Sequence, residues 1–374
     1  MVNGRDVVLR NSTLLCLDFA VRICVENLDG DIVAIHLQKK EKYQLNRIAA
    51  YILIFFSGGD TVENALKRIS KEFDLLSEEF FSALDALLAS DLLVFTEDHR
   101  CKATFKKSKQ WISNGWIESL DYNLLTTDYP FLDYRSTDSW AEDVERMEKY
   151  RVHDKEPSRH KNELINAKKI ECESTIVSLK SLNSSINEIF SPNSVNEALD
   201  VSRLKSIISC SLGKLRERPV PGHPEIPPFL RKTSPSGGSR HPTEGYIINL
   251  SLEAIDNGLY WFSPQSYSLQ LVNRKFDIRE IRTNLEGLFR AEFEPRVLVV
   301  LTSVFKRNMF RYREPRTFRT IFIDAGHVAS TIEMVSRALK VKSFVQHGIN
   351  DKWFEGYANI SGLEEGAILG IALG

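Results

Sequence analysis

A cluster of prolines near the middle of the chain restricts the fold more than any other feature of the sequence. Five prolines occur in the eleven residues from Arg218 to Pro228. Proline lacks a backbone N–H and clashes with a preceding helical turn, so this stretch must be extended. A helix is predicted before it at 195–211. Runs of apolar and β-branched residues predict strands after it at 246–250, 258–262, 268–272 and 296–304.

The remaining C-terminal residues complete a domain of mixed helix and sheet. Residues 326–339 have the apolar spacing of an amphipathic helix, and residues 342–347 and 367–373 are expected to form late strands. Several strands follow one another like hairpins, without a regular strand–helix–strand repeat. This pattern predicts an α+β domain over residues 196–374.

The N-terminal part has a different pattern. Short strands are expected at 6–10, 15–25 and 32–37, followed by a buried helix at 43–56. Thr61 is a good N-cap for an amphipathic helix at 61–73, Ser77 is expected to cap another helix, and a strand is expected at 92–95. Together these elements predict a small winged-helix domain over residues 1–105.

Residues 106–195 are expected to be a helical or irregular connecting region. The sequence becomes highly charged between Glu142 and Lys169, which is typical of a solvated helix or loop. Residues 181–196 are rich in Ser and Asn and are expected to lie on the surface. We assign no chemistry to this region. A chain of 374 residues has room for these three parts at about 150 residues per domain.

Composition excludes several classes of function. Lysine and arginine number 49 against 50 aspartates and glutamates, so the charge balance gives no reason to expect nucleic acid as a partner. The longest apolar run, Ile48 to Phe56, is far short of the ~20 residues that span a membrane. No secretory signal is evident, and the five scattered cysteines form no CxxC pair. We therefore expect a cytoplasmic protein with reduced thiols, no metal site and no membrane partner.

Residues 231–242, with the sequence RKTSPSGGSRHP, are the sharpest local signal. They combine four cations or potential cations with serine hydroxyls and two adjacent glycines. Glycines let backbone N–H groups approach a ligand closely, and arginine offers a planar fork for phosphate. The spacing is neither that of a P-loop nor GxGxxG. Binding of an anion or a cofactor is one interpretation, and a structural turn before the strand at 246–250 is the other.

Two further segments carry charged side chains in suggestive places. Residues 306–319 hold six cations in fourteen residues directly after an apolar strand, which suits either an anionic ligand or a solvated loop. In the segment 324–327, Asp324 is a candidate helix N-cap and His327 would lie in the first turn. The chain contains no GxSxG elbow and no HExxH, so neither a hydrolase triad nor a zinc hydrolase is supported.

Taken together, these three segments resemble the SagB-type dehydrogenases, the FMN-dependent azoline oxidases of the nitroreductase superfamily. That family commonly shows an SPSGGxRHPxExY-like stretch, and this chain has SPSGGSRHPTEGY from Ser234 to Tyr246. The basic loop, the YR-like pair and the DxGH segment of the family correspond here to Arg311-Tyr312, Phe318-Arg319 and residues 324–327. The resemblance spans Ser234 to His327.

The resemblance implies a nitroreductase-like FMN domain, with a mixed or antiparallel sheet flanked by helices. It also implies a homodimer with two FMN sites at the subunit interface. The catalytic candidates are Tyr312 and Arg311. The cofactor-binding candidates are Arg231, Ser234, Pro235, Ser236, Gly237, Gly238, Arg240, His241, Arg319 and His327.

The basic loop departs from the family at one position. In azoline oxidases a lysine and a tyrosine act together as the base that removes a proton, while hydride goes to the flavin. Arg311 occupies the place of that lysine. A buried lysine can become a neutral amine, whereas an arginine keeps its proton. Arg311 could still hold a carboxylate or stabilise an anion, and Tyr312 could still act as acid or base.

The N-terminal part resembles the PqqD-like peptide-recognition domains attached to enzymes that modify ribosomal peptides. The stretches that carry this resemblance are GGDTVENALKRI and SEEFFSALDALLASDLLVF. The resemblance implies that a leader peptide binds by adding a strand to a sheet edge. A domain that only supports oligomerisation is the alternative. DNA binding is disfavoured because acidic residues offset Lys67, Arg68 and Lys71.

Three functions are compatible with the sequence. The first is dehydrogenation of azolines to thiazoles or oxazoles in a ribosomal peptide, with a cyclodehydratase as partner enzyme. The second is a different flavin reaction, such as reduction of a dehydroamino acid made by a dehydratase, or oxidation of a small molecule. The third is an inactive subunit that binds a leader peptide and assembles partner enzymes.

Overall fold

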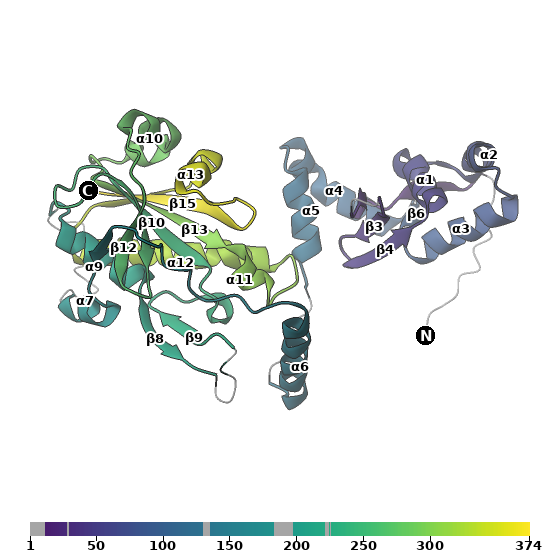
Figure 1. Ribbon diagram of the computed structural model, residues 1–374. Helices are drawn as coiled ribbons and strands as arrows, with labels where there is room; N and C mark the ends of the chain where they lie inside the picture. Colours follow the sequence, from purple (N-terminus) through teal and green to yellow (C-terminus); the bar gives the residue numbers. More distant parts are fainter. Residues whose placement is uncertain (1–11, 28–29, 130–134, 183–196, 221–223, 225) are drawn as a thin grey trace. The chain divides into compact units, whose positions relative to one another are not determined.

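The computed structural model describes residues 12–27, 30–129, 135–182, 197–220, 224 and 226–374 (Figure 1). Contacts divide the chain into two compact units, Met1–Phe131 and Leu132–Gly374. The strand expected at 6–10 and most of the Ser- and Asn-rich segment at 181–196 lie outside the described residues. Within the described ranges, no helix has both the length and the apolar character needed to cross a lipid bilayer.

The first unit combines two small antiparallel sheets with helices. One sheet has the order β5-β1-β6 and the other β2-β3-β4. The strands are β1 (Leu14–Leu17), β2 (Val21–Val25), β3 (Ile32–His36), β4 (Glu41–Leu45), β5 (Asp60–Thr61) and β6 (Leu93–Phe95). The helices are α1 (Arg47–Phe55), α2 (Val62–Phe73), α3 (Ser77–Ala89), α4 (His99–Ser113) and α5 (Ile117–Thr126). Leu15, Ala34, Ile52, Ile69 and Leu84 come from both sheets and from three helices and lie in one hydrophobic core.

In the first unit, the predicted cap of α2 is confirmed, but the predicted bounds of one strand and one helix are wrong. Thr61 caps α2 as expected, with its side chain accepting a hydrogen bond from the Asn64 N–H. The expected strand 15–25 is instead two strands separated by a turn, in which the Asp18 side chain accepts from Ala20. The expected helix 43–56 begins only at Arg47, because β4 continues to Leu45.

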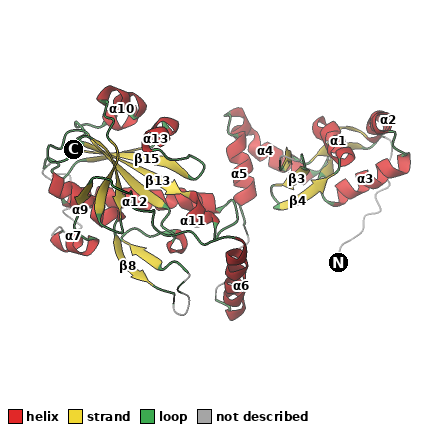
Figure 2. Ribbon diagram, viewed as in Figure 1, coloured by secondary structure: helices red, strands yellow, loops and turns green. Residues whose placement is uncertain are grey.

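The second unit is built on a seven-stranded sheet in which every described pairing is antiparallel. Strands are drawn in yellow in Figure 2. The strand order is β14-β15-β13-β10-β11-β12-β7. The strands are β7 (Lys169–Glu171), β10 (Thr243–Asn249), β11 (Gly258–Ser263), β12 (Ser268–Asn273), β13 (Val297–Val304), β14 (Ser343–Gln346) and β15 (Glu365–Leu373). These strands confirm the expected α+β character, and β10 to β13 lie close to the strands predicted from the sequence.

Helices cover both faces of this sheet. On one face, α9 (Val201–Leu212) and α12 (Thr317–Ala338) pack against Ile247, Val299 and Leu301. On the other, α10 (Ile278–Asn284), η3 (Glu286–Arg290) and α13 (Asp351–Ala358) pack against alternate residues such as Ile248, Leu298 and Val300. Alternation along each strand therefore places one apolar set on each face.

The proline-rich stretch joins the two strands of a hairpin. β8 (Lys214–Arg218) pairs antiparallel with β9 (Phe229–Lys232) in a separate two-stranded sheet. The described residues of 218–228 form no helix, as expected. Residues 221–223 and 225 lie outside the described ranges. The hairpin leads directly into the serine- and glycine-rich residues that follow.

One helix boundary was predicted wrongly. Asp324 is not an N-cap, and His327 is not in a first turn, because α12 begins at Thr317. The helix starts just after Pro315, where the Thr317 hydroxyl donates to the Glu314 carboxylate over 2.7 Å. Proline is well suited to the beginning of a helix and prevents an earlier start. Asp324 and His327 therefore project from the interior of a 22-residue helix.

Candidate active site at the glycine segment

Residues 234–242, here called the glycine segment, are fixed to α12 by side-chain hydrogen bonds. The Ser236 hydroxyl donates to Asp324 Oδ2 over 2.6 Å, and the Gly237 N–H donates to Asp324 Oδ1 over 3.2 Å. Ser234 Oγ lies 2.7 Å from Thr331 Oγ1, about two turns further along α12. Burial raises the pKa of Asp324, and the bonds from Ser236 and Gly237 only partly offset that effect.

The backbone of the glycine segment brings it close to Tyr312. Gly238 has a φ of 60°, in the left-handed region that favours glycine. A Cβ atom at Gly238 would lie 2.3 Å from the Tyr312 hydroxyl oxygen, and one at Gly237 would lie 2.5 Å from Thr320 Cγ2 of α12. Two adjacent glycines therefore let the segment pass between α12 and the Tyr312 side chain.

Tyr312 and Arg311 lie in the turn after α11 (Phe305–Met309). Both of their N–H groups donate to the Asn308 carbonyl, over 3.1 Å for Arg311 and 2.9 Å for Tyr312. The Arg311 guanidinium carbon is 5.4 Å from the centre of the Tyr312 ring. Its Nη2 pairs with Asp143 Oδ2 at 2.7 Å, on α6 (Thr137–His153). The sequence-predicted catalytic pair is thus adjacent in space as well as in sequence.

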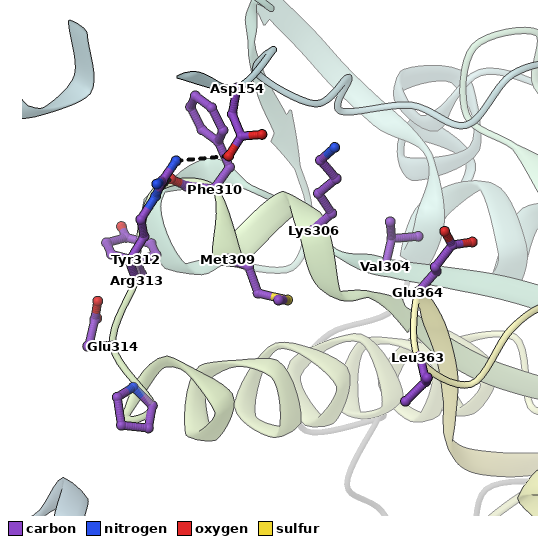
Figure 3. Close-up of a pocket in the computed structure, with 11 residues that line it drawn as sticks. Asp154, Val304, Lys306, Met309, Phe310, Tyr312, Arg313, Glu314, Leu363 and Glu364 are labelled. Carbon is purple, nitrogen blue, oxygen red and sulfur yellow. Dashed lines mark hydrogen bonds and ion pairs between the residues drawn. The ribbon is translucent and has the colours of Figure 1, made fainter. Parts of the chain in front are cut away.

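An open pocket of about 850 Å³ adjoins this turn. Figure 3 shows Tyr312, Arg313 and Glu314 following one another along the loop into α12, with Lys306 and Met309 projecting from α11. Leu363 and Glu364 contribute from the loop before β15. The complete lining is Asp154, Val304, Lys306, Met309, Phe310, Tyr312, Arg313, Glu314, Pro315, Leu363 and Glu364. Its apolar surface with charged groups at several points suits an amphipathic ligand.

Buried cations support the glycine segment from within the second unit. Arg240 is 3% exposed, and its Nη1 pairs with Glu156 Oε1 at 2.6 Å. Arg307 is equally buried; its Nη1 pairs with Glu244 at 2.6 Å and donates to the His241 carbonyl over 2.8 Å. The Arg240 guanidinium therefore faces Glu156 in the interior, where it stabilises the end of the segment.

Three basic groups in this region have lowered pKa values, chiefly because they are buried and in part because of neighbouring positive charges. Burial, with the nearby Arg307 charge, lowers the pKa of Lys232 to about 8 despite the opposing effect of Glu244. Burial together with Arg159 lowers the pKa of Arg240 to about 10. Burial and the Lys232 charge lower the pKa of His241 to about 3, so this imidazole is neutral at physiological pH. Burial is the largest cause of all three shifts, and the charges of neighbouring cations add to it.

The other predicted site residues lie at different depths. His327 faces the glycine segment: its carbonyl accepts from Ser234 over 3.4 Å, and its Nδ1 is buried without a hydrogen-bond partner among the described residues. Arg319 lies half-buried in the first turns of α12. Arg231 and Pro235 are exposed. The site roles of all these residues stay predictions.

Several residues of the site were missed by sequence reasoning. Asp143 and Glu156 come from the charged stretch to which no chemistry was assigned. Lys161, from the same stretch, pairs with Glu365 at 2.6 Å and donates to the Tyr246 hydroxyl over 2.6 Å. A charged run looks the same in sequence whether it is solvated or paired, so no local signal could have found these side chains.

Comparison with known proteins gives partial matches. No protein-family model matches the chain. It is 31% identical over 113 residues to the trifolitoxin-processing protein TfxB of Rhizobium leguminosarum bv. trifolii, covering 29% of this chain and 30% of that protein. It is 26% identical over 109 residues to the putative nitroreductase MJ1384 of Methanocaldococcus jannaschii, covering 29% of this chain and 54% of that protein. The matches thus span less than two thirds of either relative.

Among solved structures, the chain is similar to one from the E. coli microcin synthetase McbBCD complex with truncated pro-MccB17 bound. The match has a TM-score of 0.39 and 17% sequence identity, and covers 63% of this chain and 93% of that chain.

Proposed function

We propose that this chain is an FMN-dependent oxidoreductase that tailors a ribosomally made peptide, and that its leading reaction is the dehydrogenation of azolines to azoles. The observation that carries the proposal is the Tyr312 hydroxyl lying against Gly238 at the edge of the pocket of about 850 Å³. Similarity to a trifolitoxin-processing protein supports peptide tailoring, and similarity to a putative nitroreductase supports flavin chemistry.

The groups in and around the glycine segment fit FMN in two respects. Burial, with a smaller contribution from neighbouring cations, lowers the pKa of Lys232 and of Arg240, and an anion such as a flavin phosphate would stabilise the charged forms of both groups. The buried Nδ1 of His327 lacks a partner in the described chain, and a ligand atom could supply one. Ser234 to His241, with Arg231, Arg319 and His327, would hold the cofactor.

The protein groups around the substrate have distinct tasks in this proposal. FMN, when bound, supplies the hydride acceptor. Tyr312, as the phenolate beside the Arg311 cation, would take the proton that leaves the adjacent carbon, since this residue lines the pocket. Arg311 remains a cation, because its ion pair with Asp143 raises its pKa in spite of burial. It therefore stabilises negative charge and takes no proton.

The same Arg311 favours a second candidate reaction. A guanidinium paired at 2.7 Å with Asp143 offers no neutral amine, unlike the lysine expected in azoline oxidases. Reduction of a dehydroamino acid needs an acid that delivers a proton, which Tyr312 with an adjacent cation could provide. In that case a nicotinamide donor reduces the flavin.

The first unit would capture the leader of the precursor peptide. The outer strands of its β2-β3-β4 sheet, β2 and β4, each have one edge without a partner strand among the described residues. An extended leader adds to such an edge through backbone hydrogen bonds. Binding there raises the local concentration of the core peptide near the catalytic unit and compensates for weak recognition of the core.

The second unit would pair with another copy of itself through α12. Phe322, Ile323 and Met334 on this helix are each about half exposed, at 49%, 55% and 46%. Large apolar side chains gathered on one helix are typical of a covered interface. A homodimer of this kind is also what the resemblance to SagB-type dehydrogenases implies.

Turnover of an azoline-bearing precursor peptide tests the proposed reaction. Each ring oxidised should lower the peptide mass by two hydrogen atoms, as followed by mass spectrometry. Tyr312→Phe should keep the bound flavin and slow the reaction by about 10²-fold or more, since it removes the proton acceptor. Tyr357→Phe is the control. Tyr357 lies in α13, and its hydroxyl donates to the Lys275 carbonyl. An unchanged rate in Tyr312→Phe would remove this residue from the mechanism.

A further inference from the structure

Helix α6 contacts the turn that carries Arg311 and Tyr312 through a small set of side chains. The Tyr150 ring packs edge-on against Phe310 at 6.5 Å, and the Arg313 guanidinium lies 3.9 Å above the Tyr150 ring. Arg313 also pairs with Asp154, one residue beyond α6, at 3.1 Å. These contacts fix α6 beside the turn that carries Arg311 and Tyr312.

Asp143 is the most buried charged group on this side of α6. Its residue is 4% exposed, and two arginines converge on its carboxylate: Arg146 at 2.5 Å and Arg311 at 2.7 Å. Burial alone would raise the pKa of Asp143, but the hydrogen bonds from Arg146 and Arg311 outweigh it and lower the pKa. The carboxylate is therefore charged across the physiological range, and Arg311 always has a partner.

Tyr312 is confined from two sides. On one side its hydroxyl is so close to Gly238 that no Cβ could be accommodated there. On the other, the Arg311 guanidinium lies 5.4 Å from its ring centre, and a side-chain hydrogen bond with Tyr312 contributes to the raised pKa of Arg311. The position of the guanidinium thus limits where the phenol can move, and the guanidinium is itself held by Asp143.

We propose that Asp143 is a positioning residue of the catalytic site, which holds Arg311 and through it sets the Tyr312 hydroxyl against the glycine segment. The inference rests on the proposed acid–base role of Tyr312. It assigns α6 a specific part in the chemistry, although α6 and Tyr312 are far apart in sequence. It also gives Arg311 the role of an oriented cation in place of a base.

Fluorine NMR of protein labelled with 3-fluorotyrosine tests this coupling without any need for turnover. The signal of residue 312 is assigned by its loss in Tyr312→Phe. Asp143→Asn should shift this signal and change the pH at which it titrates, because the guanidinium beside the phenol loses its anchor. Arg311→Gln should shift the same signal, and the double variant should move it no further than Arg311→Gln does.

Two variants complete the design. Glu145→Gln is the matched control: Glu145 lies on the same helix, but its carboxylate is exposed and, among the described residues, pairs only with Lys149, at 2.7 Å. It should leave the signal of residue 312 unchanged. Asp143→Glu keeps a carboxylate and should give a signal between those of the wild type and Asp143→Asn. A thermal melt shows whether Asp143→Asn folds. If that variant does not fold, the signal of Asp143→Glu tests the coupling in its place.

The outcomes separate this inference from the proposed function. If Arg311→Gln moves the signal while Asp143→Asn and Asp143→Glu leave it in place, the positioning role is wrong, whatever the enzyme does. If the signals move as expected but the protein binds no flavin, the coupling stands and the proposed reaction fails. In a protein loaded with flavin, Asp143→Asn should lower kcat about tenfold or more with little change in KM, because it misplaces a reacting group without removing a binding contact.

Discussion

At the residue scale, Gly238 shows how a missing side chain shapes the site. Its φ of 60° is strained for an alanine, and the added methyl would overlap the Tyr312 hydroxyl. Either the glycine segment or the tyrosine must then move. The two functions of this position, backbone turn and close approach, explain why the sequence has glycine here.

Gly238→Ala should therefore lower both stability and flavin retention. We expect a loss of about 1–2 kcal/mol in the free energy of unfolding. Gly356→Ala is the matched control, since a Cβ there meets nothing within 4 Å and the residue lies in α13. That variant should gain about 0.5–1 kcal/mol from helix propensity. Thermal and denaturant unfolding measure the stability of both variants, and the flavin absorbance of the purified protein measures flavin retention. Equal effects of the two substitutions would contradict the packing described.

His241 gives the stability of the second unit a defined pH dependence. Its pKa is lowered to about 3 in the folded chain by burial and by the Lys232 charge, while its Nε2–H donates to the Leu230 carbonyl. In the unfolded chain it titrates near the ordinary value of 6.5. The unfolded state thus binds more protons between these two pH values, so the contribution of His241 to stability is fully present above pH 6.5 and is lost as the pH falls.

His241→Asn should make this dependence shallower. Asparagine tolerates the left-handed backbone at this position, where φ is 45°, and carries no titrating group. We expect the melting temperature of the variant to change less between pH 6.5 and 5 than that of the wild type, even if it is lower overall. Substitution of the exposed His347 by asparagine should leave the slope unaltered. Parallel curves for wild type and His241→Asn would show that another group controls this range.

Sequence reasoning reached the site only where its residues are adjacent along the chain. The pattern of serines and glycines located the glycine segment, and the basic loop located Arg311 and Tyr312. The carboxylates that hold them were missed, because Asp143 lies 168 residues from Arg311 and Glu156 lies 84 residues from Arg240. Such pairings depend on the tertiary fold, and no local pattern in the sequence shows which distant charges meet.

At the scale of elements, the apolar pattern of α12 predicted that a helix forms but not where it begins. Apolar spacing after Gly326 correctly predicted a helix, but the true start lies nine residues earlier at Thr317. The residues before Gly326 include buried Ile321 and exposed Phe322 and Ile323, so their apolar side chains do not keep to one face. A helix that is apolar on two sides loses the amphipathic signal that marks its start.

The exposed apolar side chains of α12 lead to a prediction about assembly. Phe322→Asp places a charge on the helix face proposed as the dimer interface and should convert dimers to monomers, as measured by light scattering. Phe229→Asp is the control, because Phe229 is similarly exposed at 40% but lies on the hairpin strand β9. Dissociation by both variants, or by neither, would mean that α12 does not form the interface.

At the scale of the whole molecule, two compact units divide the proposed work. The first offers sheet edges to a peptide, and the second brings a glycine segment, a tyrosine and a pocket together. The strand content of the second unit could be predicted because each strand has its own apolar run. The strand order could not, since neighbours such as β15 and β13 pair across more than sixty residues of sequence.

The central claim is that the second unit binds FMN, and the visible absorption spectrum of the freshly purified protein tests it most directly. We expect the two bands of an oxidised flavin, and heat should release about one FMN per chain. Such a result would leave only the substrate and the direction of the reaction to be determined. A colourless protein that also fails to take up added FMN would contradict the proposed oxidoreductase and favour a peptide-binding subunit without flavin chemistry.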